Sequence, residues 1–241
     1  MMELCLERAR YWVHEASSIA VLTGAGISAE SGIPTFRGAG GLWKQFRAED
    51  LATPRAFARD PKTVWEWYNW RRGLIQDAQP NHGHTALAEL ERRVPRFTLI
   101  TQNVDGLHRR AGSQNVLEVH GSIWQLRCTE CERSWLDPIV PLALPPPCQC
   151  GAIARPGVVW FGEMLPQEVW AAAEKATAEC NVFLVVGTSA VVYPAAGLVH
   201  LARESGAKVV EINKEETTIS AGVDCALIGP AGDLLPKLLS V

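Results

Sequence analysis

The 241-residue sequence lacks the excess of basic residues that is typical of proteins that bind nucleic acid, because 23 Lys and Arg stand against 26 Asp and Glu, for a net charge of -3 at pH 7. It also lacks the low hydrophobicity of a disordered chain, since 47% of its residues are hydrophobic and only 20% are charged. At roughly 150 residues per domain, the length predicts one large domain or one domain that carries an insertion. We therefore expect a globular protein with no nucleic-acid partner.

The sequence predicts no signal peptide at its first residues and no uninterrupted membrane span. Residues 1–16 mix Glu and Arg into their apolar positions, so we expect an amphipathic helix there and not an apolar leader. Residues 180–202 contain no Asp, Glu, Lys or Arg, and this segment is long enough to cross a bilayer. Gly187–Ser189 and Tyr193-Pro194, however, interrupt it. We expect a buried strand, a loop and a helix in this segment. These patterns predict a soluble, cytoplasmic protein with no membrane partner.

Cysteine is scarce outside one cluster, which excludes a small disulfide scaffold. Four of the seven cysteines form two close pairs, Cys128-x-x-Cys131 and Cys148-x-Cys150, and Cys5, Cys180 and Cys225 stand alone. Two such pairs separated by a loop are typical of thiolate ligands for zinc. No histidine accompanies the pairs, so the metal is expected to be structural. The alternative interpretation is a pair of incidental or redox-active dithiols.

A glycine-rich turn follows directly after a short strand-forming run. Ser18–Thr23 is apolar, and Gly24-Ala25-Gly26-Ile27-Ser28-Ala29 after it has the pattern G-x-G-x-x-A. In a dinucleotide-binding fold the first Gly allows the tight turn, the second lets the backbone approach a pyrophosphate, and the small last residue lets helix pack on strand. The turn therefore predicts a dinucleotide site.

The rest of the chain alternates strands with helices, which predicts an α/β fold with a Rossmann-like, doubly wound parallel sheet. Further strands are expected at Phe97–Thr101, Val116–Val119, Asn181–Val186, Ala207–Ile212 and Cys225–Ile228, and helices at His84–Arg93, Gln167–Glu179 and Ala195–Glu204. Ligands of such sheets bind at the carboxyl ends of the strands. Five strand ends carry polar clusters, at Thr23-Gly24, Thr101–Asn103, His120-Gly121, Gly187–Ser189 and Asn213–Glu215. We expect these clusters to converge on one crevice.

The segment after the glycine turn departs from an ordinary dehydrogenase. Gly32-Ile33-Pro34 stops any helix within a few residues, and residues 35–43 then contain three glycines, a cation and two aromatic residues. A mobile lid over the cofactor is the favoured interpretation, and an ordinary surface loop is the alternative.

The motifs together resemble the sirtuin family of NAD-dependent protein lysine deacylases. The resemblance is carried by Gly24–Ser28, Gly32–Arg37, Gln102–Asp105, His120-Gly121 and the four cysteines, with Gly187–Ser189 and Asn213. It implies a Rossmann NAD-binding domain at residues 1–40, 81–122 and 156–241. A helical insertion at 41–80 and a zinc module at 123–155 would form a small domain. The implied co-substrate is NAD, which is consumed, with one structural zinc and acyl-lysine proteins as partners of a monomeric enzyme.

The resemblance also implies roles for particular residues. His120 would be the base and Asn103 a second catalytic residue, while Asp105, with the backbone near Ile27 and Val104, would hold nicotinamide. The implied NAD-binding residues are Gly24, Ala25, Gly26, Ile27, Ser28, Thr35, Phe36, Arg37, Trp43, Gln102, Asn103, Val104, Asp105, Gly187, Thr188, Ser189, Asn213, Lys214, Glu215 and Ala231. Val158, Phe161, Val191 and Tyr193 would contact the peptide, and Cys128, Cys131, Cys148 and Cys150 would hold zinc. His108 is expected to serve structure, with a functional contact as the alternative.

One helix suggests which acyl group is removed. Within residues 62–78, apolar and aromatic side chains recur at three- and four-residue steps, and Arg71 lies in the middle of this stripe. The pattern alone favours an internal salt bridge or a side chain that reaches water. Tyr68 and Arg71, however, match the Tyr-x-x-Arg pair of the sirtuin class that prefers succinyl- and malonyl-lysine, in which both side chains receive the acyl carboxylate. The stripe comprises Val64, Trp67, Tyr68, Arg71, Leu74, Ile75 and Ala78.

Two other functions remain open from the sequence. A mono-ADP-ribosyltransferase would use the same NAD cleavage with another nucleophile, and a zinc-ribbon interaction module would bind protein or nucleic acid without catalysis. The presence of His120 and of the complete Gln102–Asp105 motif counts against the second alternative.

Overall fold

Six parallel strands form the main sheet of the computed structural model, which describes residues 2–36, 41–42 and 46–240. The strand order is β3-β2-β1-β7-β8-β9, and every neighbouring pair is parallel. The strands are β1 (Ser18–Thr23), β2 (Arg96–Thr101), β3 (Val116–Glu118), β7 (Val182–Val186), β8 (Lys208–Asn213) and β9 (Cys225–Ile228). The predicted doubly wound parallel sheet is confirmed.

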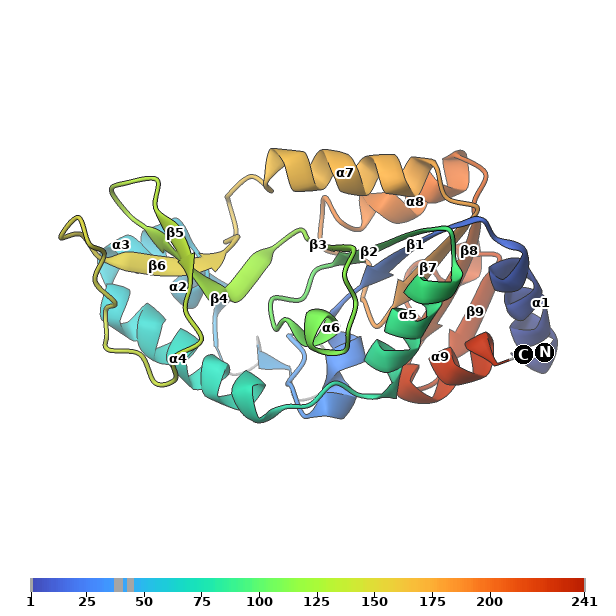
Figure 1. Ribbon diagram of the computed structural model, residues 1–241, viewed down its shortest axis with the longest axis horizontal. Helices are drawn as coiled ribbons and strands as arrows, with labels where there is room; N and C mark the ends of the chain where they lie inside the picture. The colour runs from blue at the N-terminus through green and yellow to red at the C-terminus, as the bar shows by residue number, and fades with distance from the viewer. Residues whose placement is uncertain (1, 37–40, 43–45, 241) are drawn as a thin grey trace.

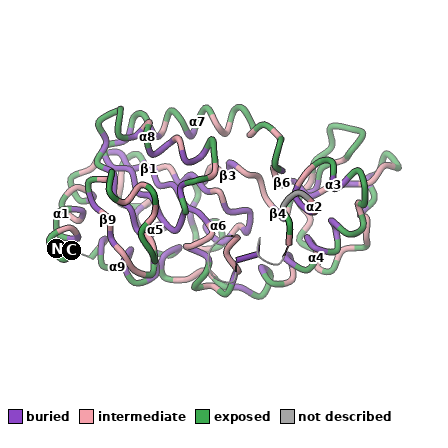
Figure 2. The backbone as a smooth tube through the Cα atoms, turned by 180° about the vertical axis from the view of Figure 1, so that it is seen from behind, coloured by how far each residue is buried: buried purple, intermediate pink, exposed green. Residues whose placement is uncertain are grey.

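Helices cover both faces of this sheet (Figure 1). Ile19 and Val21 of β1 belong to a core shared with α1, α5 and α9, whereas Ala20 and Leu22 belong to a core shared with α7 and α8. Alternate side chains of a strand point to opposite faces, so both faces of β1 are apolar. Figure 2 shows the strands as the buried centre of this part of the chain. The helices are α1 (Met2–Glu15), α5 (His82–Arg93), α7 (Gln167–Ala178), α8 (Gly197–Glu204) and α9 (Ala231–Leu239).

The strand order reverses between β1 and β7, which run side by side with Ile19 opposite Val182. A reversal of this kind opens a crevice at the carboxyl ends of the two strands. After β1, the chain forms a 3₁₀ helix, η1 (Ala25–Ser31), which ends at Gly32 with a left-handed φ of 82°. The predicted short helix and its stop are confirmed.

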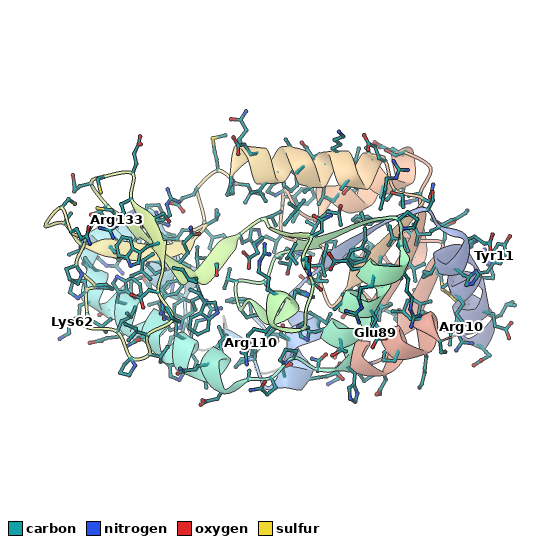
Figure 3. The ribbon with its side chains drawn as sticks, in the orientation of Figure 1. Arg10, Tyr11, Lys62, Glu89, Arg110 and Arg133 are labelled. Atoms are coloured by element: carbon teal, nitrogen blue, oxygen red, sulfur yellow. A yellow bond between two sulfur atoms is a disulfide. The ribbon has the colours of Figure 1, made fainter. Side chains whose placement is uncertain are left out.

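A smaller lobe lies at the other end of the molecule (Figure 1). Figure 3 shows Lys62 and Arg133 in this lobe, far from Arg10 and Tyr11 on α1. Its core joins an antiparallel sheet of order β5-β4-β6 to three helices. These elements are α2 (Ala48–Leu51), α3 (Pro54–Arg59), α4 (Pro61–Asp77), β4 (Gly121–Cys128), β5 (Ser134–Leu136) and β6 (Ala154–Val158). The sequence pattern indicated no strands in this lobe, and β4 and β6 extend slightly beyond the predicted zinc module.

Short elements complete the chain, namely α6 (Leu107–Arg110) and η3 (Ser220–Gly222). None of the helices in the described ranges combines the length and the apolar character that a membrane span requires.

Two sequence interpretations are corrected by the structure. Cys5 on α1 and Cys225 on β9 do not stand alone, because they form a disulfide across 220 residues of sequence. Packing of α1 on the edge strand β9 brings them together, which no local pattern could show. Leu74 belongs to the apolar stripe of α4 but is 38% exposed, whereas Tyr68, Arg71 and Ile75 of the same stripe are buried.

Candidate active site

A cavity of about 1260 Å³ opens at the carboxyl ends of the parallel strands, between the sheet and the smaller lobe. Residues at or just after the ends of five strands line it, as expected, and these are Gly24, Gln102, Asn103, His120, Gly187–Ser189 and Asn213–Glu215. The small lobe contributes Trp67, Tyr68 and Arg71 of α4, and Val158 at the end of β6. The crevice predicted from strand ends is therefore one continuous site shared by both lobes.

The two glycines of the turn are required by close packing within the protein. A Cβ atom on Gly24 would lie 2.7 Å from Thr188 Cβ, and one on Gly26 would lie 2.7 Å from Gly187 Cα. The Gly26 N–H donates to the Gly187 carbonyl oxygen at 2.7 Å. The glycine pattern predicts that Gly26 lets the backbone approach a pyrophosphate. The structure shows a protein neighbour at that position, so the turn after β1 and the turn after β7 hold each other at the mouth of the crevice.

Side-chain amides fix the floor of the cavity. Asn103 Nδ2 donates to the Gly24 carbonyl oxygen at 3.0 Å and to Ser28 Oγ at 3.2 Å. Gln102 Nε2 donates to Thr188 Oγ1 at 3.0 Å. These bonds join the loop after β2 to the loops after β1 and β7, so the side chains that line the cavity are held in place before any ligand binds.

Three of the predicted NAD-binding residues lie behind the cavity wall. Ile27, Ser28 and Asp105 are buried and do not line the cavity. Ser28 Oγ donates to Asp105 Oδ2 at 2.8 Å, and the Leu107 N–H donates to Asp105 Oδ1 at 2.9 Å. Burial raises the pKa of Asp105, and the two hydrogen bonds oppose that rise. The structure therefore places Asp105 where it holds the loop after β2.

His120 lines the cavity with a defined tautomer. Its Nδ1 lies 3.1 Å from the Gln102 carbonyl oxygen, which only accepts, so Nδ1 carries the proton. Nε2 is then the basic nitrogen. Burial lowers the pKa of His120, and the bond to Gln102 partly offsets that effect. The imidazole is therefore neutral near pH 7 and able to accept a proton.

The other buried histidines serve the fold. His84 Nδ1 accepts the Asn81 N–H at 3.3 Å in a capping box that begins α5. His108 Nε2 lies 3.0 Å from Thr23 Oγ1 beneath the site. Burial lowers the pKa of both imidazoles, that of His84 to about 4. The expected structural role of His108 agrees with this position.

Arg71 and Tyr68 form the end of the cavity in the small lobe. Arg71 is only 7% exposed, and its guanidinium lies 4.9 Å from the ring centroids of both Phe36 and Trp67. Among the described residues it makes no ion pair and no hydrogen bond. Burial lowers the pKa of Arg71, and the nearby Tyr68 and Asp105 oppose that effect, but a guanidinium remains charged in proteins. The internal salt bridge that the helical pattern alone favoured, as one of two interpretations, is absent from the described part of the chain.

Several predicted residues differ in how they relate to the cavity. Phe161 and Tyr193 line it and are 45% and 70% exposed, whereas Val191 is exposed but does not line it. Arg37 and Trp43 lie outside the described residues. Further lining residues, to which the sequence motifs gave no individual role, include Trp67, Trp160, Glu163, Glu216 and Thr217. Their position depends on contacts between distant segments, which no local pattern shows.

The four clustered cysteines fit a structural zinc site. Their Sγ atoms all lie within 4.8 Å of one another, with 3.4 Å between Cys128 and Cys150 and 3.9 Å between Cys131 and Cys148. Tetrahedral zinc with Zn–S bonds of ~2.3 Å requires sulfur separations of ~3.8 Å. Hydrogen bonds from backbone N–H groups, that of Cys131 foremost, lower the pKa of Cys128 to about 6. Four thiolate ligands leave no open coordination position on the ion for catalysis. Because the cysteines lie at and after the end of β4 and in the loop before β6, the ion would connect these two segments.

Comparisons with known proteins agree with this geometry. A model of the Sir2 family matches residues 24–194. A protein named NAD-dependent protein deacylase from Aquifex aeolicus is 58% identical over 212 residues, which cover 87% of this chain and 89% of that protein. NAD-dependent protein deacylase 1 from Archaeoglobus fulgidus is 50% identical over 229 residues, 94% of each chain.

Solved structures show the same likeness. The crystal structure of a Sir2 homologue in complex with NAD superposes with a TM-score of 0.92 at 49% identity, covering 97% of this chain and 92% of that one. The structure of Sir2Af2 bound to a myristoylated histone peptide has a TM-score of 0.79 at 34% identity, covering 99% and 96%. The similarity therefore extends over both lobes.

Proposed function

Because the chain belongs to the Sir2 family of NAD-dependent protein deacylases, we propose that it removes succinyl and malonyl groups from protein lysines more efficiently than acetyl groups. An interaction module without catalysis is excluded by that membership. The observation that carries the proposal is the buried guanidinium of Arg71, which has no anionic partner among the described residues and lies beside Tyr68 at the cavity wall.

A buried charge without a partner is costly, because desolvation of an ion must be offset by pairing. The aromatic rings of Phe36 and Trp67 offset part of this cost through cation–π contacts. A carboxylate offers a stronger partner, since it accepts two parallel hydrogen bonds from a guanidinium. Succinyl- and malonyl-lysine carry such a carboxylate at the far end of the acyl group, and acetyl-lysine carries none.

We propose the following roles for the residues of the cavity. When bound, NAD supplies a glycosidic bond to nicotinamide, and its cleavage exposes a sugar carbon to the acyl oxygen of the substrate. Asn103 and Gln102 orient the ribose, and the loops at Gly187–Ser189 and Asn213–Glu215 hold the adenosine half. His120 accepts a proton from a ribose hydroxyl through Nε2. One water molecule is consumed, and the products are nicotinamide, 2'-O-acyl-ADP-ribose and free lysine.

Phe161 and Tyr193 support the proposed peptide-binding mode, because they line the cavity while remaining partly exposed. We propose that the segments Gly157–Glu163 and Val191–Pro194 clamp an extended acyl-peptide between them and read its backbone more than its side chains. Val158 would contact the acyl-lysine chain at the end of β6.

The test is a set of peptides of one sequence that differ only at the lysine. The acyl groups are acetyl, malonyl, succinyl and the neutral succinamide analogue, which has the size of succinyl without its charge. Mass spectrometry with and without NAD follows free lysine and 2'-O-acyl-ADP-ribose. We expect kcat/KM for succinyl-lysine to exceed those for acetyl-lysine and for the succinamide analogue. Equal kcat/KM values for succinyl-lysine, acetyl-lysine and the succinamide analogue would refute the proposed preference for acidic acyl groups. ADP-ribosylated peptide as the main product would indicate a mono-ADP-ribosyltransferase.

A further inference from the structure

The phenol of Tyr68 has a single hydrogen-bonding partner among the described residues. Trp160 Nε1 lies 2.9 Å from Tyr68 Oη, and both side chains are buried, with exposures of 3% and 1%. Tyr68 belongs to α4 and Trp160 follows β6, so the bond joins two segments that are 92 residues apart in sequence. Both residues line the cavity.

The direction of this bond follows from the chemistry of the two groups. An indole N–H only donates, whereas a phenol can donate one proton and accept through its lone pairs. Tyr68 therefore accepts from Trp160, and its own proton is not used in that bond. Burial raises the pKa of Tyr68 above its usual value, against the opposing effects of Arg71 and Trp160, so the phenol keeps its proton at neutral pH.

Trp160 itself is held firmly. The Arg155 guanidinium lies 3.5 Å from the centroid of its ring, and the ring of Phe57 lies 5.3 Å away. Glu163 Oε2 accepts the Trp160 backbone N–H at 2.8 Å, and the same carboxylate accepts two hydrogen bonds from Arg155. The indole therefore cannot turn its N–H away from Tyr68 without disturbing this arrangement.

We propose that Trp160 is a positioning residue for acyl specificity, which occupies an acceptor site of Tyr68 so that the phenol proton is donated into the cavity. Tyr68 and Arg71 then present only donors to the end of the acyl group. A carboxylate accepts from both, and a neutral or donor-bearing group leaves one donor unpaired, which is costly when buried. This inference rests on the proposed preference for succinyl and malonyl groups.

The test replaces Trp160 by Phe, which removes the N–H and retains an aromatic ring next to Arg155 and Phe57. We expect the ratio of kcat/KM for succinyl-lysine to that for acetyl-lysine to fall about 3- to 10-fold, the worth of one hydrogen bond between neutral groups, through a higher KM for the succinyl peptide. In a Tyr68→Phe background, Trp160→Phe should not change the ratio further. Trp135→Phe, a tryptophan of β5 in the same lobe, is the control and should leave the ratio unchanged.

If Trp160→Phe leaves the ratio of succinyl to acetyl kcat/KM unchanged, the proposal is overturned. An equal fall of this ratio in the Tyr68 and Tyr68→Phe backgrounds would also overturn it, because either result would assign Trp160 to packing alone. Failure of the proposed function is seen separately, since the unmodified enzyme would then show no preference for succinyl over its neutral analogue, and the role of Trp160 would fail with it.

If the Trp160→Phe variant does not fold, the indole N–H resonances in NMR spectra of the unmodified enzyme test the proposal. One of them should shift more with succinyl-peptide than with acetyl-peptide, and equal spectra would refute the proposal.

Discussion

Nδ1 of His120 lies 3.1 Å from the carbonyl oxygen of Gln102, so the residue next to Asn103 in the loop after β2 determines which nitrogen of the imidazole is basic. Replacement of His120 by Ala removes that base. We expect kcat to fall by about 10²- to 10⁴-fold while NAD affinity changes little, since in the proposed mechanism the imidazole moves a proton and does not hold the dinucleotide. Turnover and calorimetric NAD binding measure this, with His200→Ala, an exposed histidine of α8, as the control. More than a tenth of the original kcat in His120→Ala would contradict the assignment.

The pH profile offers an independent check on His120. Burial lowers its pKa from the usual 6.5, so the neutral, proton-accepting form persists below that pH. Activity should therefore be constant near pH 7 and decline as the pH falls through a midpoint below 6.5. Measurement of kcat/KM between pH 5 and 8 at fixed ionic strength, over roughly the range in which an imidazole titrates, tests this. A midpoint above 7 would point to a different group.

Replacement of Arg71 by Met should separate the two classes of substrate. We expect kcat/KM for succinyl-lysine to fall at least ~30-fold, taking ~2 kcal/mol for a hydrogen bond to a charged group, with only a few-fold change for acetyl-lysine. Arg59→Met, at an exposed arginine of α3, is the matched control. If both activities fall equally in Arg71→Met, the guanidinium has a structural role only.

The cysteine cluster should hold one zinc ion per chain. Cys148 is the buried member of the four, and Cys148→Ser should lose zinc and destabilise the sheet β5-β4-β6 and, with it, catalysis. Metal analysis and hydrogen exchange over residues 121–158 measure both effects. Cys180→Ala, at a buried free cysteine outside the cluster, should keep its zinc. A metal-free preparation with full activity would exclude the structural role.

The bond between Cys5 and Cys225 should contribute to stability, because it connects α1 to β9 across most of the chain. We expect Cys5→Ser, Cys225→Ser and the double variant each to lower the free energy of unfolding by the same ~2 to 4 kcal/mol. Denaturant unfolding with and without reductant measures this, and the reductant should affect only the unmodified protein. Additive losses in the double variant would show that the two residues act independently.

A buried carboxylate should control NAD affinity from outside the cavity. Glu211 on β8 is fully buried and accepts hydrogen bonds of 2.5 Å from both Thr217 and Ser220, and this loop lines the cavity through Lys214 and Glu215. Glu211→Ala should raise KM for NAD about 10-fold with a smaller effect on kcat. The KM of Glu211→Gln should lie between those of the unmodified enzyme and of Glu211→Ala. Glu204→Ala, exposed on α8, is the control. An unchanged KM with a lower melting temperature would assign Glu211 to stability alone.

Local patterns in the sequence were sufficient for the sheet and for the place of the site. A continuous apolar run such as that of β7 indicates a strand that is buried on both faces. Residues that follow parallel strands must lie at the same edge of the sheet. The two cysteine pairs likewise required only short-range spacing to indicate zinc. The antiparallel strands β4, β5 and β6 were missed because their alternation of apolar and polar residues is weak. The exposure of Leu74 was missed because helical periodicity gives a face of the helix but not the width of its buried part.

Tertiary structure alone decided which distant side chains meet. Packing of whole elements, or the course of a loop, brings together the residues of three contacts. These are the Cys5–Cys225 disulfide, the hydrogen bond from Trp160 to Tyr68, and the hydrogen bonds that Glu211 accepts from the loop after β8. Arg71 shows the difference most clearly. Its sequence pattern favoured a salt bridge, and only the folded chain shows an aromatic enclosure with no acid beside it among the described residues, because pairing depends on what neighbouring elements bring within reach. The domain boundaries, the monomeric state and the cytoplasmic location stay predictions.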